Sequence, residues 1–427
     1  MNRRELFAAG TGAFIAATPA GAAARDLVKT SPATAQNTRT ISVMDFGATG
    51  NGKTDDTAAL QAALLATFQT DEKGNLGGRL LIIPPGAYVV NRTLAVSLQK
   101  HEQNQPTQQT TIRGHGAILL SNIEDGSNVL EISSHATARF LLIDGLTIQG
   151  RGHEGNGLTL DVDRERAYLY NFCLRDFIAQ GCGGDGLSMV GNIFESQIFN
   201  SYFRDNKGNG ARMGHGPNGG ILSAIHLFGC VFGGNGKNGV ALVRKACDVA
   251  FHGCYFLENG NFGVSAPSGC TLLSNCGFEN NHMSAEDFHS GDAGVRLQVF
   301  GTLIGCTAYS IHKQTHLLRA FITNQLVMIG CTASGGGDAK GARLAKLQSN
   351  RYGTATIVGC QGGVDSIGTF EAAQFGDAHA GARFGGNWDS ASLMHLGDYS
   401  IWIDREGRLR IKNGEPLSDG DGREVGS

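Results

Sequence analysis

Charged and titratable side chains recur at the ends of short β-rich runs in the middle of the chain. Acidic residues, a histidine and pairs of cations follow one another there, and the candidate catalytic residues are Asp161, Asp163, Asp185, Arg212, His215, Arg244 and Lys245. Proton abstraction needs a base, and cations stabilise the negative charge that develops as the proton leaves. A mixed acidic and basic cluster of this kind is suited to an acidic sugar polymer.

A repeated phrase predicts how these residues are brought together. From about residue 112 onward, a short β-rich run is followed by a small residue or Cys and then by Asn and Gly, as in Leu227–Asn235. Aligning the phrase gives one set of equivalent positions on successive coils: Cys173, Asn200, Cys230, Cys254, Cys276, Cys306, Cys331 and Cys360. One turn therefore takes about 27 residues, a period typical of solenoids, whose single continuous core replaces several ordinary domains.

The cysteines follow this repeat, which bears on their chemistry. Ten cysteines in an exported protein would ordinarily suggest disulfides. Side chains in a parallel in-register ladder point the same way, however, which is poor geometry for a disulfide. No Cys-x-x-Cys pair or Cys/His cluster at metal-ligand spacing occurs either. We predict that the laddered cysteines are reduced and act as small buried hydrophobic residues.

The segment from residue 41 to residue 90 carries the most specific motif. It contains Asp45-Phe-Gly-Ala48, then Asp55-Asp56-Thr57, and later Pro85-Gly86-Ala-Tyr88. This block resembles the opening segment of the pectate-lyase-like superfamily, which includes rhamnogalacturonases, polygalacturonases and epimerases. The resemblance implies an all-β fold, a right-handed parallel β-helix with an N-terminal capping helix. We expect that helix to begin near Thr54, with Asp55 and Asp56 in its first turn, where carboxylates favour the helix dipole.

The same segment offers a competing interpretation. Gly47 to Thr54 fits the nucleotide-binding pattern G-x-x-x-x-G-K-T, and Asp144 is a candidate magnesium partner. The two aspartates directly after Thr54 would repel phosphate, and the coil repeat leaves no parallel α/β sheet. We therefore expect no nucleotide site.

The resemblance implies that the substrate groove lies over one parallel sheet. Its strands are opened by Gly followed by an apolar residue, and a period of two points these apolar residues inward: Leu158, Leu187, Ala211, Val240, Val264 and Val295. Their successors are expected to point outward: Thr159, Ser188, Arg212, Ala241, Ser265 and Arg296. The remaining candidate residues follow at the strand ends.

Polysaccharide lyases of this fold neutralise a uronate carboxylate with Ca²⁺ or basic groups and remove the proton at C5 with Arg, Lys or His. By this resemblance the base candidates are Arg212 and His215, and the residues that hold the carboxylate are Arg244 and Lys245. Asp161 and Asp163 would form the Ca²⁺ site. β-Elimination of an acidic polysaccharide is thus the first expectation, and epimerisation is another outcome of the same proton abstraction.

Glycoside hydrolysis is the alternative chemistry and needs two carboxyl groups. The order of motifs is similar to that of polygalacturonases: Asp161-Val-Asp163, Gly184-Asp185-Gly186, Gly214-His215-Gly216 and Arg244-Lys245. Asp185 stands alone where that family has a pair, and Asp-Gly before a strand is by itself a turn signal. His215 follows its strand where the family's motif precedes it.

The two ends of the chain carry separate signals. Residues 1–24 read as a cleavable export signal, with Arg3-Arg4 resembling a twin-arginine motif, and residues 25–40 read as a linker before the β-helix at 41–395. The net charge of -3 gives no electrostatic footprint for nucleic acid, and no later apolar run is long enough to span a membrane. We expect a periplasmic or secreted protein.

Residues 396–427 alternate polar and apolar residues between Gly turns, which predicts a small C-terminal β module. This segment resembles closing segments of phage tail-spike-like and bacterial surface β-helix proteins. It leaves a third hypothesis, a non-catalytic glycan-binding or surface structural protein, and two oligomeric states, a monomer or a homotrimer.

Overall fold

The computed structural model describes most of the chain between residues 39 and 425. The described ranges are 39–69, 78–98, 110–135, 137–162, 167–216, 219–266, 271–281, 292–297, 300–310, 316–322, 325–335, 343–349, 354–361, 364–367, 373–376, 393–396, 399–403, 406, 408–413 and 420–425. The predicted export signal and nearly all of the predicted linker lie outside them. No helix in these ranges is long and apolar enough to cross a membrane.

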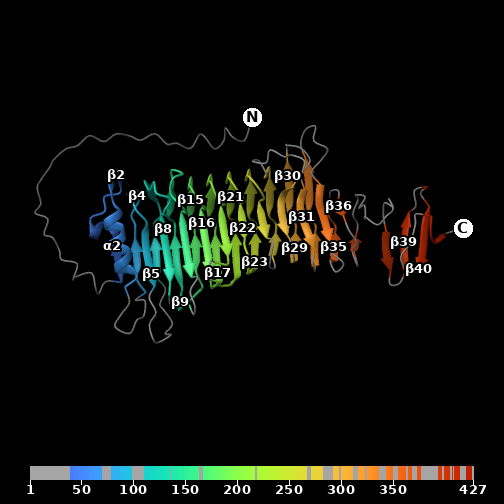
Figure 1. Ribbon diagram of the computed structural model, residues 1–427, viewed down its shortest axis with the longest axis horizontal. Coiled ribbons are helices and arrows are strands. Elements are labelled where there is room, and N and C mark those ends of the chain that lie inside the picture. Colours follow the sequence, from blue (N-terminus) through green and yellow to red (C-terminus); the bar gives the residue numbers. More distant parts are fainter. Residues whose placement is uncertain are drawn as a thin grey trace, which may run out of the picture. The chain divides into compact units, whose positions relative to one another are not determined.

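Three parallel sheets make up the wall of a solenoid (Figure 1). Sheet A contains β1 (Thr40–Ser42), β3 (Leu80–Ile82), β6 (Thr110–Arg113), β9 (Thr137–Arg139), β10 (Leu141–Asp144), β13 (Tyr168–Tyr170), β14 (Cys173–Arg175), β17 (Ile193–Phe199), β20 (Leu222–Phe228), β23 (Ala246–His252), β26 (Thr271–Ser274), β29 (Phe300–Ile304), β32 (Gln325–Ile329), β35 (Thr354–Val358) and β37 (Ala373–Gly376). Sheet B contains β2 (Asn51–Asp55), β4 (Gly86–Val90), β7 (Ala117–Ser121), β11 (Thr147–Gln149), β15 (Ile178–Gln180), β18 (Tyr202–Arg204), β21 (Val231–Gly233), β24 (Tyr255–Leu257), β27 (Gly277–Glu279), β30 (Thr307–Ser310) and β33 (Thr332–Gly335). Sheet C contains β5 (Leu94–Leu98), β8 (Leu130–Ser134), β12 (Leu158–Val162), β16 (Leu187–Gly191), β19 (Ala211–Gly214), β22 (Val240–Leu242), β25 (Val264–Ala266), β28 (Asp292–Leu297), β31 (His316–Ile322), β34 (Arg343–Ser349) and β36 (Val364–Ile367).

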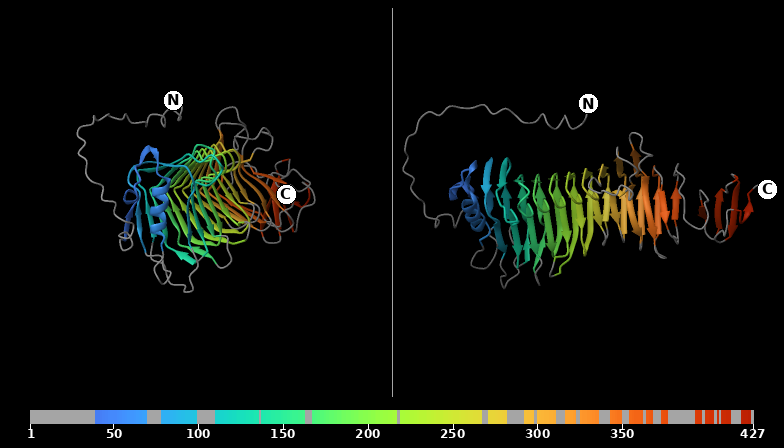
Figure 2. Two further views of the ribbon diagram at one scale, coloured as in Figure 1. Left: turned by 60° about the vertical axis from the view of Figure 1, so that its left-hand side comes forward. Right: turned by 45° about the horizontal axis from the view of Figure 1, so that its top comes forward.

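Each coil runs through sheet C, then sheet A, then sheet B, and the next coil begins again in sheet C. Strands of successive coils therefore lie side by side (Figure 2). The predicted fold class, a parallel β-helix, is confirmed. A separate antiparallel sheet, sheet D, consists of β38 (Leu393–Leu396), β39 (Tyr399–Ile403), β40 (Leu409–Asn413) and β41 (Arg423–Glu424).

The first coil is covered by a short 3-10 helix, η3 (Val43–Phe46), and by helix α2 (Thr57–Thr67). Leu60, Ala63 and Leu64 of α2 are buried in the core that they share with β1 and β3. The helix begins at Thr57, so the expectation of a start near Thr54 was wrong. Asp55 ends strand β2 instead, where its carboxylate accepts a hydrogen bond from the Thr57 amide at 2.9 Å.

The nucleotide-binding pattern has a structural explanation. The Asp56 carboxylate accepts hydrogen bonds from the Thr49 amide at 2.6 Å, the Thr49 hydroxyl at 3.0 Å and the Gly50 amide at 3.1 Å. Backbone amides of this loop, which would cradle phosphate in a nucleotide-binding protein, thus hold an aspartate of the same chain. The Gly-rich pattern in this protein closes a turn.

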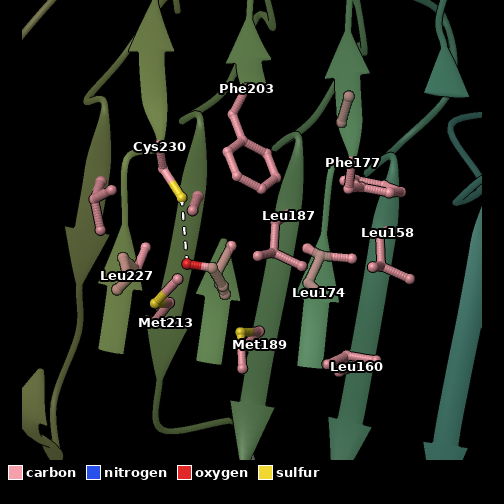
Figure 3. Packing of buried hydrophobic residues seen from close by; sticks show 14 of the residues in the cluster. Leu158, Leu160, Leu174, Phe177, Leu187, Met189, Phe203, Met213, Leu227 and Cys230 are labelled. Atoms are coloured by element: carbon pink, nitrogen blue, oxygen red, sulfur yellow. Dashed lines mark hydrogen bonds between the residues drawn. The ribbon is translucent and has the colours of Figure 1, made fainter. Parts of the chain in front are cut away.

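The core is a column of aliphatic and aromatic side chains enclosed by the three sheets (Figure 3). The apolar residues that open the strands of sheet C are all fully buried, as the period of two predicts: Leu158, Leu187, Ala211, Val240, Val264 and Val295. Sheet A and sheet B supply the opposing walls, including Leu174, Phe177 and Phe203 (Figure 3). Because a coil buries these groups only against its neighbours, the core is continuous along the solenoid.

The cysteine ladder is confirmed in six of its eight predicted positions. Cys230, Cys254, Cys276, Cys306, Cys331 and Cys360 each follow a residue with a φ near +50° to +60° at the turn from sheet A to sheet B. Each is buried as a free thiol. The Cys230 thiol, labelled in Figure 3, donates to the Ile198 carbonyl of the preceding coil at 3.5 Å.

Two members of the predicted ladder were wrong. Cys173 pairs in register with Gln197 on sheet A, so it points outward, and the position equivalent to Cys230 in that coil is Phe177. Asn200 is the left-handed turn residue itself, with a φ of 43°, and Ser201 takes the ladder position. The Ser201 hydroxyl donates to the Phe199 carbonyl at 2.8 Å, as the ladder thiols do to the carbonyl two residues before them.

Two further ladders stiffen the turns between sheet B and sheet C. In the first, the Asn235 side chain accepts from the Asn206 amide group at 2.9 Å and donates to Asn259 at 2.9 Å, and Asn281 continues the row. The second ladder contains Asn156, Asp185, Asn209 and Asn238. Buried amide side chains of this kind satisfy backbone groups that the turns leave unpaired.

Candidate functional site

The strands of sheet C follow the predicted register. The positions predicted to point outward are in register with one another: Thr159, Ser188, Arg212, Ala241, Ser265 and Arg296. Of these, Thr159 and Ser188 are buried, and Arg212, Ala241 and Ser265 are half-buried. Glu131 precedes the row, and Arg319, Lys346 and Asp365 follow it. Neighbouring members lie about 4.8 Å apart because they sit on adjacent parallel strands. Sequence pattern alone was enough to assign this register.

Arg212 and Asp161 lie on the outer face of sheet C, two coils apart. Both side chains are half-buried, and each stands between two buried residues of its strand. Asp161 pairs in register with Val190, which pairs with Gly214. The Asp161 position is therefore about 10 Å along the solenoid from Gly214, two residues beyond Arg212. Asp163 lies outside the described residues.

Three basic residues converge at the turn from sheet C to sheet A, which we call the basic corner: His215, Arg244 and Lys245. The His215 amide donates to the Arg244 carbonyl at 2.9 Å, which joins the two coils directly. Arg244 and Lys245 are exposed, and the Lys245 carbonyl accepts from the Leu222 amide at 3.0 Å. The backbone thus holds the three residues together.

Gly214 makes this close approach feasible. Its φ is +135°, and a Cβ atom there would lie 2.8 Å from the Val243 carbonyl oxygen and 3.1 Å from that of Arg244. A side chain would therefore push the two coils apart at the basic corner.

The His215 ring has a defined neighbour. Its Nδ1 lies 3.3 Å from the Gly220 carbonyl oxygen. A carbonyl only accepts hydrogen bonds, so this contact assigns the proton of the neutral ring to Nδ1 and leaves the Nε2 lone pair available. Gly220 is fixed in turn against the preceding coil, because a Cβ there would lie 2.5 Å from the Gly191 Cα. His215 is half-buried, so a substrate has access to its ring.

Asp185 has a structural environment. Its carboxylate is buried and accepts hydrogen bonds from the Asn209 amide at 2.7 Å and from the Asn209 side chain at 2.8 Å. Its own amide donates to the Asn156 side chain at 2.9 Å. It therefore belongs to the turn ladder and does not lie on the outer face with Arg212.

Glu131 is a carboxylate that the sequence pattern did not single out. It lies on the outer face of β8, paired in register with Thr159, and accepts from the Asn128 side chain at 3.0 Å. Because Asp161 lies one strand over and two residues further along, the two Cα atoms are about 8 Å apart. Two half-buried carboxylates therefore share this part of sheet C.

An aromatic cluster on the outer face of sheet A was also missed: Tyr168, Tyr170 and Phe194. Their ring centroids are 5.5 to 6.2 Å apart, and the Arg139 guanidinium lies 4.4 Å from the centroid of Tyr170. β13 and β17 begin just after the turns from sheet C. The cluster therefore lies in the coil of Asp161 and in the next coil, which precedes that of His215. The alternation Tyr-Leu-Tyr at 168–170 was the signal for it.

The predicted Ca²⁺ site at Asp161 and Asp163 stays a prediction, because Asp163 lies outside the described residues. Ca²⁺ takes six to eight oxygen ligands. Asp161 contributes one carboxylate, and its register neighbours are Ser133 and Val190. The remaining ligands of such a site would come from Asp163 and its neighbours.

A second acidic group lies at the turn from sheet A to sheet B. His115, Asp144 and Asp176 place ligand-type atoms within 4.8 Å of one another. The buried Asp144 carboxylate already pairs with Arg175 at 2.8 Å and with Arg113 at 3.5 Å. Hydrogen bonding to Arg175 holds the pKa of Asp144 below its ordinary value in spite of burial. Arginine therefore supplies the countercharge that a metal would otherwise provide.

This architecture is a parallel β-helix with charged residues on one outer sheet, and the sequence comparisons agree with that fold. The chain belongs to the rhamnogalacturonase A/epimerase, pectate lyase-like family, whose model matches residues 40–285. Residues 328–427 match the capsule depolymerase family model. The resemblances inferred from the N-terminal block and from the C-terminal segment are confirmed.

Individual relatives are more distant. The mannuronan C5-epimerase AlgE2 of Azotobacter vinelandii is 27% identical over 267 residues, which cover 52% of this chain and 25% of that protein. ORF18 of Geobacillus virus E2 is similar in structure, with a TM-score of 0.55, 18% identity, and coverage of 87% of this chain and 66% of that chain. Tailspike protein 2 of Escherichia coli O157:H7 bacteriophage CAB120 has a TM-score of 0.57, 14% identity, and coverage of 76% and 43%. These structural likenesses concern the fold.

Proposed function

We propose that this protein cleaves an acidic polysaccharide by β-elimination, on sheet C beside the basic corner. The observation that carries the proposal is the contact of His215 Nδ1 with the Gly220 carbonyl at 3.3 Å, because it leaves Nε2 as a proton acceptor. Three cations, Arg212, Arg244 and Lys245, stand on the same two coils. A base and a set of cations are the two requirements for removing a proton next to a carboxylate.

In the proposed step, the uronate carboxylate lies against these cations, which makes the neighbouring C5 proton more acidic. Nε2 of His215 accepts that proton, and the electron pair of the C–H bond forms the double bond between C4 and C5. The bond between C4 and the glycosidic oxygen breaks, and the oxygen leaves with its electron pair and takes a proton from water. One product chain thus ends in an unsaturated uronate.

Family membership supports this chemistry. The related AlgE2 is a C5-epimerase by name, and epimerisation begins with the same proton abstraction but returns a proton to the opposite face. The match of residues 328–427 to the capsule depolymerase family supports cleavage of an extracellular polymer. A periplasmic or secreted location, directed by the segment with Arg3-Arg4, is part of the proposal.

The test compares two products of digestion on a panel of acidic and neutral polysaccharides. β-Elimination gives an ultraviolet absorbance from the conjugated double bond, and it gives new reducing ends in equal number. Replacing His215 with Ala should lower both signals by about 10²- to 10⁴-fold, the usual contribution of a general base. The matched control is His226→Ala, a half-buried histidine on β20 of the same coil that faces outward from sheet A.

Each alternative has its own result. Shortened polymer without ultraviolet absorbance rejects the elimination. Inverted C5 stereochemistry without shortening identifies an epimerase. Binding without any turnover supports the non-catalytic hypothesis.

A hydrolase remains a second candidate because Glu131 and Asp161 share the outer face of sheet C. Glycoside hydrolysis needs two carboxyl groups on one face, and these two positions lie on adjacent strands of sheet C, two residues out of register. In this case Glu131→Gln abolishes the appearance of reducing ends, whereas under the elimination proposal it leaves the ultraviolet signal.

A further inference from the structure

One aromatic row on sheet A ends abruptly. Its in-register members are Arg139, Tyr170, Phe194, Ser223 and Cys247. Tyr170 is covered on one side by the Arg139 guanidinium at 4.4 Å and on the other by Phe194, with ring centroids 5.5 Å apart. Beyond Phe194 the next coil offers a serine. The second side of the Phe194 ring therefore faces a small polar residue.

A neighbouring row on the same sheet shows the contrast. Phe228 lies between Phe199, with centroids 5.0 Å apart, and His252, with centroids 4.8 Å apart. The interplanar angles are 11° and 16°, so both sides of Phe228 are stacked against rings. Aromatic stacking thus continues on both sides of Phe228, whereas at Phe194 it stops on the side of Ser223.

Two polar side chains, Ser223 and Asp248, lie at and beside the position that follows Phe194 in the row. The Ser223 hydroxyl donates to the Asp248 carboxylate at 3.3 Å, and Asp248 is exposed. Lys245 of the basic corner precedes Asp248 by three residues, so the open side of Phe194 is close to the proposed active site. A ring face beside a carboxylate and a hydroxyl suits a pyranose, whose C–H face is apolar and whose neighbouring hydroxyls donate hydrogen bonds.

We propose that a neutral pyranose unit of the polysaccharide stacks on the second side of Phe194 and donates hydroxyl hydrogen bonds to Asp248. The Asp248 carboxylate repels a uronate, whereas the basic corner attracts one. The inference rests on the proposed function for the identity of the polymer as the substrate. It implies a heteropolysaccharide that carries neutral as well as acidic sugars.

The test measures binding and does not depend on turnover. Saturation-transfer difference NMR on the purified protein is run with three neutral tetrasaccharides, derived from cellulose, mannan and galactan. We expect transfer to the ring C–H protons of at least one of them, and a loss of most of that transfer in Phe194→Ala. Phe228→Ala is the matched control, because it removes the same ring from a position where both faces are already covered. Asp248→Asn should weaken binding less, because the amide still accepts hydrogen bonds.

The outcomes separate this inference from the proposed function. No Phe194-dependent transfer from any of the three tetrasaccharides, with both variants folded by circular dichroism, overturns the sugar subsite whatever the activity assay shows. Equal loss in Phe194→Ala and Phe228→Ala also overturns it, because the effect then reflects the sheet. Transfer that depends on Phe194 upholds the subsite even if the ultraviolet assay for elimination is negative.

Discussion

The buried ladders repeat the same contacts from coil to coil, whereas the basic corner depends on contacts that do not repeat. In the ladders, each coil repeats its neighbour, as Asn206, Asn235 and Asn259 do with the same amide contacts. At the basic corner the repeat fails, because Gly214 leads into a turn in which His215 contacts Gly220 of its own coil and Arg244 of the next. The interfaces between neighbouring coils stabilise a solenoid, whereas the proposed chemistry depends on local contacts of the basic corner. The candidate chemistry should therefore respond to changes at the corner, and stability to changes in the ladders.

The largest effect on activity outside the proposed base is expected for Gly214→Ala. The added methyl group meets carbonyl oxygens of Val243 and Arg244 and so displaces His215 from the cations. A misplacement of about 1 Å costs about 10²-fold in rate. Initial rates of digestion, compared at equal folded concentration, check this. A rate within twofold of the wild type would show that the corner does not position the chemistry.

In the ladder, Asn235→Ala should lower stability and leave the rate unchanged. The amide of Asn235 joins Asn206, Asn259 and the Phe203 carbonyl, and its loss leaves buried polar groups unsatisfied. Each such group costs about 1–3 kcal/mol. Chemical denaturation should show a drop of about 2–4 kcal/mol in unfolding free energy, with the rate per folded molecule unchanged. A large loss of rate in the folded variant would contradict the division of roles.

A smaller and pH-dependent effect is expected at Asp144. Hydrogen bonds from Arg175 hold its pKa below that of an unfolded aspartate, so its contribution to stability is present above about pH 4 and is lost as the pH falls through the folded pKa. Asp144→Asn should lower stability at neutral pH by about 1–3 kcal/mol and make it less sensitive to acid. Melting temperatures from pH 7 to pH 3 test this. Parallel curves for the two proteins would exclude the linkage.

The smallest perturbation is chemical labelling of the thiols. The ladder cysteines and Cys182 are buried, and burial raises the pKa of Cys182 to about 12. Cys173 and Cys247 are half-buried and face outward. Among the cysteines that the structure describes, we expect a thiol reagent to modify these two first in the native protein and the ladder only after denaturation. Rapid native modification of Cys230 or Cys254 would refute the packing of the ladder.

The sequence predicted the face of sheet C because the Gly and apolar markers fix a period of two, and the register followed without error from Leu158 to Val295. The cysteine ladder slipped at Cys173 and Asn200 because the phrase was aligned on residue type. The invariant feature is the left-handed turn residue, which is Asp176, Asn200, Gly229 or Asn275 in different coils. The turn residues of different coils thus share a backbone conformation but not a residue type.

The candidate site was only partly accessible from sequence for a related reason. His215, Arg244 and Arg212 are recognisable by type and by their places at strand ends. The role of Gly220, the nearness of Glu131 to Asp161 and the end of the aromatic row at Phe194 depend on which residues adjacent coils align. The offset between register partners is not constant, since it is 22 residues for Phe256 and Phe278 but 31 for Leu142 and Cys173. Asp185 shows the converse, since its apparent motif is a turn residue held by Asn209.

The strands of sheet C are evenly spaced, so the outer face repeats at a fixed distance along the solenoid. Each coil advances about 4.8 Å along the solenoid, a distance comparable with the length of one sugar unit, so a chain lying along the wall meets one coil for each unit or nearly so. Under the proposed function, we expect positions in register with Arg212 on later coils, such as Ala241 and Ser265, to meet units of the polymer away from the bond that breaks. We expect changes there to alter the length of the fragments released and to leave the rate of the chemical step at the basic corner unchanged.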